Sequence, residues 1–126
     1  MVRFIWLILV AAFVSCAKEE TASTNQNNIV GKWLRVEEYV NPGSGGNWIQ
    51  TNDVPPVTVE FTAGGKIISN HPLYSNYTNY KTSGTDSIEI TNPGNNSRFA
   101  SYSLANGRLT LTTACRDGCG DRFARQ

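Results

Sequence analysis

The clearest structural signal in the chain lies in residues 102–111, which read Tyr102-Ser103-Leu104-Ala105-Asn106-Gly107-Arg108-Leu109-Thr110-Leu111. Asn-Gly is the preferred pair at the centre of a two-residue type I′ turn, because both positions need a positive φ. Such a turn places Leu104 opposite Leu109 on one face of the hairpin. Tyr102 then faces Leu111 on the same side. The turn chemistry and the apolar pattern therefore predict one antiparallel hairpin.

The rest of the domain repeats this alternation of apolar and polar residues. Apolar residues alternate with polar ones in residues 57–62 and 87–91, and no window of residues 29–126 keeps an apolar stripe at helical spacing for three turns. Ala63-Gly64-Gly65-Lys66 predicts a second hairpin. Strands are expected at residues 31–40, 47–51, 57–62, 66–70, 77–82, 87–91, 98–105, 108–114 and 121–125.

Gly-, Asn- and Pro-rich loops separate these strands, at residues 41–46, 53–56 and 92–96. This pattern argues against parallel βαβ units, because they need crossover helices. Antiparallel strands in this number leave exposed sheet edges unless the sheet closes on itself. We therefore expect residues 29–126 to form an all-β domain, a small antiparallel up-and-down β-barrel of about eight strands.

Residues 1–15 predict a signal peptide. Arg3 precedes an unbroken apolar run over residues 4–14. At about 1.5 Å per residue this run covers about half of a hydrocarbon core about 30 Å thick, so a membrane-spanning helix is the weaker interpretation. Phe13-Val14-Ser15-Cys16 resembles the lipobox of bacterial lipoproteins, which implies that Cys16 is acylated and becomes the amino terminus. The alternative is cleavage elsewhere, with Cys16 left as a thiol.

Residues 16–28 predict a flexible tether. They contain Lys18-Glu19-Glu20 and then mostly Thr, Ser, Asn and Gln, which bury too little apolar surface to offset their ordering entropy. Lys-Glu-Glu also resembles the acidic export signals of some Gram-negative lipoproteins, although a solubilising tether explains the same residues. We expect a lipid-anchored protein of the cell outer membrane, with surface exposure as an open alternative.

Composition sets the domain count and excludes one class of partner. The 126 residues leave about a hundred after the tether, which suits one domain with one core, and the formal net charge is only +1. No Lys and Arg cluster is interleaved with aromatic residues, so nucleic-acid binding is not expected. We expect a monomer.

The two ends of the domain carry a family resemblance. Gly31-Lys32-Trp33 resembles the Gly-x-Trp that opens the first strand of lipocalins, and the last expected strand carries Arg122-Phe123-Ala124-Arg125. In that family the Trp closes one end of the barrel and an Arg from the last element lies across its ring. The resemblance implies these barrel-closing parts for Trp33 and for Arg122 or Arg125. With its lipobox, tether and Cys-x-x-x-Cys, the whole layout is similar to lipocalin-like lipoproteins of Gram-negative envelopes, although this domain is shorter and has no helix after the last strand.

The large apolar residues of the first expected strand do not all fall on one face. In a regular strand Leu34 and Val36 point to one face, whereas Trp33 and Tyr39 point to the other. A bulge between residues 35 and 38, or a covered outer face, reconciles them.

Few residues offer catalytic or metal chemistry. Cys115 and Cys119 are expected to form a disulfide, with a metal or redox site as the alternative. His71 lies in a turn-like Asn70-His71-Pro72 and is expected to be solvated rather than to act as a base. Glu37 and Glu38 are adjacent on a strand and so point to opposite faces. No nucleophile has a partner motif, so we expect no enzyme activity, no cofactor and no metal.

Aromatic residues leave two functions open. Trp48, Phe61, Tyr80 and Tyr102 are candidates to line a calyx for a small hydrophobic ligand, although core packing explains the same rings. The leading hypothesis is a non-enzymatic envelope lipoprotein that binds such a ligand. The alternative is a filled barrel whose loops, notably residues 41–46 and 92–96, contact another envelope protein or a glycan.

Overall fold

The computed structural model describes residues 28–116 and 118–126. The predicted signal peptide, the predicted acylation site Cys16 and all of the predicted tether except Asn28 lie outside the described residues. Within the described part of the chain there are nine β-strands and no helix that is long and apolar enough to cross a membrane.

Each strand matches one that the sequence predicts, with bounds that differ by two residues at most. In chain order they are β1 (Gly31–Val40), β2 (Asn47–Gln50), β3 (Thr58–Phe61), β4 (Ile67–Ser69), β5 (Asn79–Ser83), β6 (Ser87–Thr91), β7 (Ser97–Ala105), β8 (Arg108–Thr113) and β9 (Cys119–Arg125).

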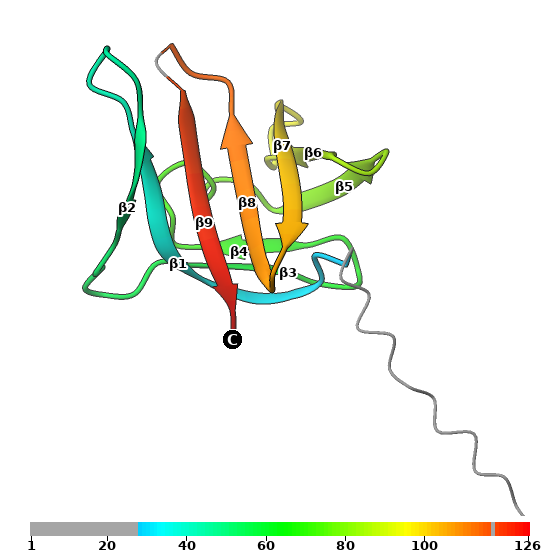
Figure 1. The fold of residues 1–126 in the computed structure, drawn as a ribbon. Coiled ribbons are helices and arrows are strands. Elements are labelled where there is room, and N and C mark those ends of the chain that lie inside the picture. The colour runs from blue at the N-terminus through cyan, green and yellow to red at the C-terminus, as the bar shows by residue number, and fades with distance from the viewer. Residues whose placement is uncertain (1–27, 117) are drawn as a thin grey trace, which may run out of the picture.

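All strands pair antiparallel in one sheet that curls into a nearly closed barrel (Figure 1). The order across the sheet is β4-β3-β1-β9-β8-β7-β6-β5, and β2 pairs with β1 beyond β3. The two ends of the sheet meet where Lys66 bridges Asn79, and the amide of Ile67 donates to the carbonyl of Thr78 at 3.1 Å. The all-β antiparallel barrel predicted from the sequence is confirmed.

The hairpin of β7 and β8 has the predicted register. Leu104 faces Leu109 and Tyr102 faces Leu111, while Asn106 and Gly107 have φ values of 53° and 72° as a type I′ turn requires. The hairpin of β3 and β4 is also present, with Phe61 opposite Ile67.

A register shift in β1 explains why its large apolar residues do not follow a strict alternation. The pairing of β1 with β9 slips between Arg35 and Glu37, which is a bulge where one was predicted. Trp33 and Arg35 thus both face inward, since Trp33 is buried and Arg35 lies opposite the buried Phe123. On its other edge β1 pairs first with β3 and then with β2.

The interior of the barrel contains a core of buried side chains. The largest side chains with less than 2% relative exposure are Trp33, Tyr74, Phe61, Phe123, Ile88, Ile90, Leu109, Leu111 and Val59. Eight of these come from strands, and Tyr74 comes from residues 70–78, here called the β4–β5 connection. The carboxyl terminus lies at the end where β1 begins, and the β1–β2 loop and the start of β9 lie at the opposite end (Figure 1).

Candidate functional site

Two buried polar side chains, His71 and Asp121, lie beside two partly buried ones, Arg35 and Asp53, and these four residues are here called the interior polar cluster. His71 is only 3% exposed and Asp121 only 5% exposed. Asp121 faces inward because it lies two residues before the buried Phe123 along β9 and so shares its face. The prediction that His71 is solvated is therefore wrong.

The β4–β5 connection carries His71 inward. The side chain of Asn70 accepts from the amide of Thr58 at 2.8 Å and donates to the carbonyl of Pro56 at 2.9 Å, which fixes where the connection starts. The amides of Tyr74 and Ser75 both donate to the carbonyl of His71, at 3.0 and 2.9 Å, and close a tight turn. This turn directs the His71 and Tyr74 rings inward, with their centroids 4.8 Å apart.

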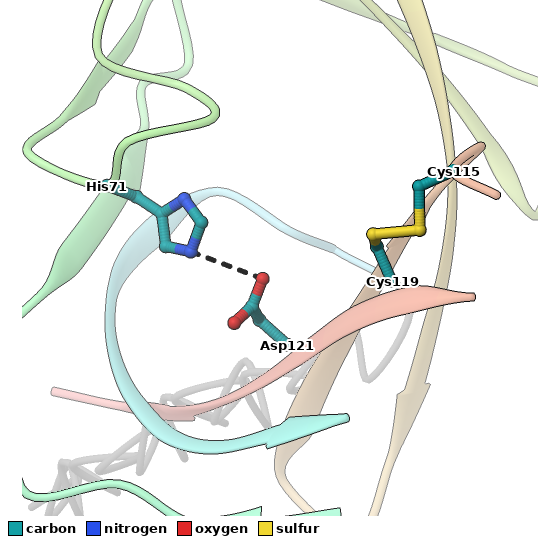
Figure 2. Close-up of a disulfide and its surroundings, with 4 residues drawn as sticks. All are labelled: His71, Cys115, Cys119 and Asp121. Carbon is teal, nitrogen blue, oxygen red and sulfur yellow. Dashed lines mark ion pairs between the residues drawn. A yellow bond between two sulfur atoms is a disulfide. The ribbon is translucent and has the colours of Figure 1, made fainter. Parts of the chain in front are cut away.

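The His71 imidazole has a defined tautomer when neutral. Its Nδ1 accepts a hydrogen bond from the amide of Leu73 at 3.1 Å, so the ring proton is on Nε2. Nε2 lies 3.2 Å from Oδ2 of Asp121, so this contact joins the β4–β5 connection to β9 (Figure 2). The two atoms are close, but the contact lacks hydrogen-bond geometry, and Nε2 is a buried atom without a hydrogen-bond partner.

Arg35 joins Asp121 to the loop between β2 and β3. Its Nε donates to Oδ2 of Asp53 at 2.9 Å and its Nη2 to Oδ1 of the same carboxylate, a bidentate pair. Nη1 lies 3.2 Å from Oδ1 of Asp121. Hydrogen bonding to Asp53 raises the pKa of Arg35, and hydrogen bonding to Arg35 lowers the pKa of Asp53. Burial, with the charge of Asp121 second, raises the pKa of the Tyr74 hydroxyl.

This arrangement does not suit a metal ion. A protonated Nε2 has no lone pair to offer, and Nδ1 already accepts an amide hydrogen bond. Across residues 28–116 and 118–126 no group of three or more His, Cys, Asp and Glu side chains is placed to hold a metal. The geometry instead provides a buried donor, Nε2–H, beside a buried acceptor, the Asp121 carboxylate.

Arg125, rather than Arg122, lies over Trp33. The guanidinium carbon of Arg125 is 4.2 Å from the Trp33 ring centroid. The guanidinium also donates to the carbonyls of Val30 and Asn28, both at 2.9 Å, while Nε1 of Trp33 donates to the carbonyl of Ile29 at 2.8 Å. These contacts fasten the chain where it enters the barrel.

Arg122 and Trp48 meet on the outer face of the barrel. Arg122 alternates with the inward-facing Asp121 and Phe123 and so points outward, with its guanidinium carbon 3.9 Å from the Trp48 ring centroid. The edge of Tyr39 packs on the same ring, with the centroids 5.4 Å apart. A Cβ at Gly46 would lie 2.0 Å from the Tyr39 ring, so only glycine leaves room for this ring. Trp48 therefore fixes β2 to the outer face and does not line the interior.

The other three candidate ligand residues belong to the core or its edge. Phe61 is 1% exposed and Tyr102 is 8% exposed. Tyr80 is half-buried, with its ring 4.9 Å from that of Phe61 and its hydroxyl donating to the carbonyl of Thr62 at 2.7 Å. These contacts favour core packing for the three rings.

The Cys115–Cys119 disulfide is present, as predicted, with the Cα atoms 5.8 Å apart. Cys119 is the first residue of β9 and pairs with Thr113, the last residue of β8. Figure 2 shows the disulfide beyond Asp121, on the side away from His71. The disulfide thus fixes the strand that positions Asp121.

Comparison with known proteins identifies no relative: no protein-family model, no curated protein and no solved structure matches the chain. The likeness to lipocalins accordingly rests on the Gly-Lys-Trp start, the contact between Arg125 and Trp33, and the barrel itself.

Proposed function

We propose that this chain is a non-enzymatic, lipocalin-like lipoprotein of the bacterial outer membrane, and that its barrel is a filled scaffold that holds a contact surface for another envelope protein. The observation that carries the proposal is the burial of the interior. Phe61 and Tyr102, two of the four rings expected to line a calyx, are packed in the core, and Trp48 lies outside. A scaffold needs no open interior, whereas a calyx does.

The lipoprotein part of the proposal rests on the sequence. The apolar run of residues 4–14 is followed by the lipobox-like Phe13-Val14-Ser15-Cys16 and by a polar tether. The described chain enters the barrel beside Trp33, and the β1–β2 loop lies at the opposite end (Figure 1). An anchor on the tether would leave the β1–β2 loop facing away from the anchored end.

The contact surface in this proposal is the β1–β2 hairpin. Val40 and Ile49 share one of its faces and are 38% and 49% exposed. The ladder of Tyr39, Trp48 and Arg122 on the other face holds the hairpin against β9. Exposed aliphatic side chains on a fixed hairpin suit contact with a protein better than contact with a glycan.

Site-specific photocrosslinking in the intact envelope tests the proposal. A photoreactive amino acid replaces Ile49 in the full chain, and a second chain carries it at Asn106, an exposed turn at the other end of the barrel. We expect a discrete, protease-sensitive adduct from position 49 and none from position 106. A protease-resistant, carbohydrate-bearing adduct would indicate a glycan instead. Absence of any adduct from position 49 would contradict a contact surface there.

A further inference from the structure

One edge of β2 is unpaired within the described residues and is here called the free edge. The outer strands of the main sheet, β4 and β5, meet through the bridge between Lys66 and Asn79, whereas β2 pairs with β1 alone. Proteins usually protect a strand edge with charged residues, proline or a bulge. β2 reads Asn47-Trp48-Ile49-Gln50 and has neither charge nor proline. The free edge is therefore open to a further strand.

The backbone of β2 points alternately to β1 and to the free edge. The amide of Thr51 donates to the carbonyl of Val36, so in this antiparallel pairing every second residue of β2 bonds to β1. The amides and carbonyls of Trp48 and Gln50 lie between these positions and point away from β1. In the described part of the chain, no backbone hydrogen bond outside the strand pairs involves Trp48 or Gln50. Their donors and acceptors have the spacing that an added strand requires.

Exposed apolar side chains lie beside the free edge. Ile49 is opposite Glu38, and Val40 follows Glu38 by two residues along β1, so the three side chains share one face of the hairpin. Ile49 is 49% exposed and Val40 is 38% exposed. A strand added to β2 would place a side chain next to Ile49 and cover it. The free edge thus combines main-chain bonding with apolar contact, as in the recognition of peptides by strand addition.

The same face carries an excess of negative charge. Nη1 of Arg35 lies 3.5 Å from Oε2 of Glu38, and Arg35 is also paired with Asp53 and Asp121. Three carboxylates thus share one guanidinium, and even a protonated His71 beside Asp121 would leave one negative charge in excess. The side chain of Glu38 is 44% exposed and is the most accessible of the three carboxylates. Glu38 is therefore available to a cation from outside the chain.

We propose that the partner of the contact surface adds an extended segment carrying Lys or Arg to the free edge of β2. Neighbouring strands lie about 4.8 Å apart, so an added strand runs about 10 Å from β1. The long side chains of Lys and Arg can reach across Ile49 to Glu38 at this distance. A second copy of this chain is less suitable, because it would bring the same negative excess to the edge. The inference rests on the proposed function, since it names the chemistry of the partner at the same hairpin.

Two changes at Gln50 separate the role of the backbone from that of the side chain. Gln50→Pro removes the outward amide, whereas Gln50→Ala removes the side chain and keeps the amide. Each change is made in the full chain with the photoreactive residue at position 49, and adduct formation is measured in the intact envelope. We expect Gln50→Pro to lower the adduct yield about tenfold, because a main-chain bond to the partner is lost, and Gln50→Ala to leave it unchanged. Circular dichroism of the purified chains checks that both are folded.

A second pair of variants tests the charge of the partner. Glu38→Gln should lower the adduct yield about threefold, as expected for the loss of a partly exposed ion pair. Glu60→Gln is the matched control, because Glu60 lies on β3 between the buried Val59 and Phe61 and so points outward from the barrel. Its adduct yield should not change. Mass spectrometry of the adduct should find Lys or Arg within the crosslinked segment of the partner.

The outcomes distinguish the inference from the function on which it rests. Equal adduct yields from folded Gln50→Pro and Gln50→Ala chains would overturn strand addition and leave the contact surface in place. An unchanged yield from Glu38→Gln, or a crosslinked segment without Lys or Arg, would overturn the assigned charge. The charge pair leaves the backbone unaltered and so decides the outcome if Gln50→Pro is unfolded. No adduct from the chain that is otherwise unchanged would contradict the proposed function itself.

Discussion

The guanidinium of Arg125, near the end of the last strand, lies over the ring of Trp33, near the start of the first, with 4.2 Å between the guanidinium carbon and the ring centroid. These residues are also partners in the β1–β9 pairing, which joins the first and last strands of the barrel. The contact therefore reinforces the pairing of the first and last strands. Cation-π contacts of this type are worth about 0.5–2 kcal/mol.

Replacing Trp33 with Ala should lower the free energy of unfolding by about 3–5 kcal/mol, as for other large buried aromatic residues. Trp33 is 1% exposed and its indole also donates to Ile29, so both packing and a hydrogen bond are lost. Urea unfolding followed by circular dichroism measures the change. Trp48→Ala on the outer face is the matched control and should cost less. A loss below about 1 kcal/mol for Trp33→Ala would remove its role in the core.

The free energy of unfolding should fall in acid because the stabilising contribution of the Asp53 carboxylate is lost. Its pKa is lowered in the folded state by the hydrogen bonds from Arg35, so its contribution is present above its ordinary pKa of 3.8 and is lost as the pH falls through the folded-state pKa. Asp53→Asn should reduce stability at pH 7 and flatten the decline below about pH 4. Unfolding free energies at several pH values test this. An equally steep decline in the variant would argue against the ion pair, and Asp86→Asn provides the control.

Removing the disulfide with the double change Cys115→Ser and Cys119→Ser should lower the free energy of unfolding by about 2 kcal/mol, the loop-closure entropy for so short a loop. The same loss should appear when the unchanged protein is unfolded with a reductant. An effect of reductant on the double variant would show that the loss has another origin.

Cys16→Ser should release the protein from membranes. Two or three acyl chains bind a bilayer strongly because each buried methylene contributes about 0.8 kcal/mol, and the variant has no acylated thiol. Fractionation of cells followed by immunodetection measures the release. Cys115→Ser should stay with the membrane fraction, since that thiol belongs to the disulfide. Retention of the Cys16→Ser chain after signal cleavage would contradict acylation at this site.

Local patterns predicted the strands well because their causes are local. Asn106-Gly107 sets the type I′ turn from two adjacent residues, and the pattern of residues 87–91 buries one face of β6 and leaves the other partly exposed. The sequence also predicted a bulge in β1 as one explanation, because Trp33 and Val36 would point to opposite faces of a regular strand.

Contacts across the barrel, between residues far apart in the sequence, could not be predicted from local patterns. His71 lies in a Pro-containing, turn-like stretch that predicts a solvated loop. Its burial depends on residues far away in the sequence: Asn70 hydrogen-bonds to residues 56 and 58, and Asp121 lies on β9. The apolar Leu73, Tyr74 and Tyr77 after His71 were the available signal for an inward connection. Trp48 was misplaced because β2 pairs beyond β3 on the same edge of β1, outside the main path of the sheet.

The proposed filled barrel places the His71 ring in the packed interior, and nuclear Overhauser effects from the only imidazole of the chain measure this packing directly. In the full chain without added ligand, the His71 ring protons should show cross-peaks to the rings of Tyr74 and Phe123, which lie 4.8 and 6.4 Å away between centroids. A His71 ring with cross-peaks only to its sequence neighbours and with rapid proton exchange with water would contradict the filled interior.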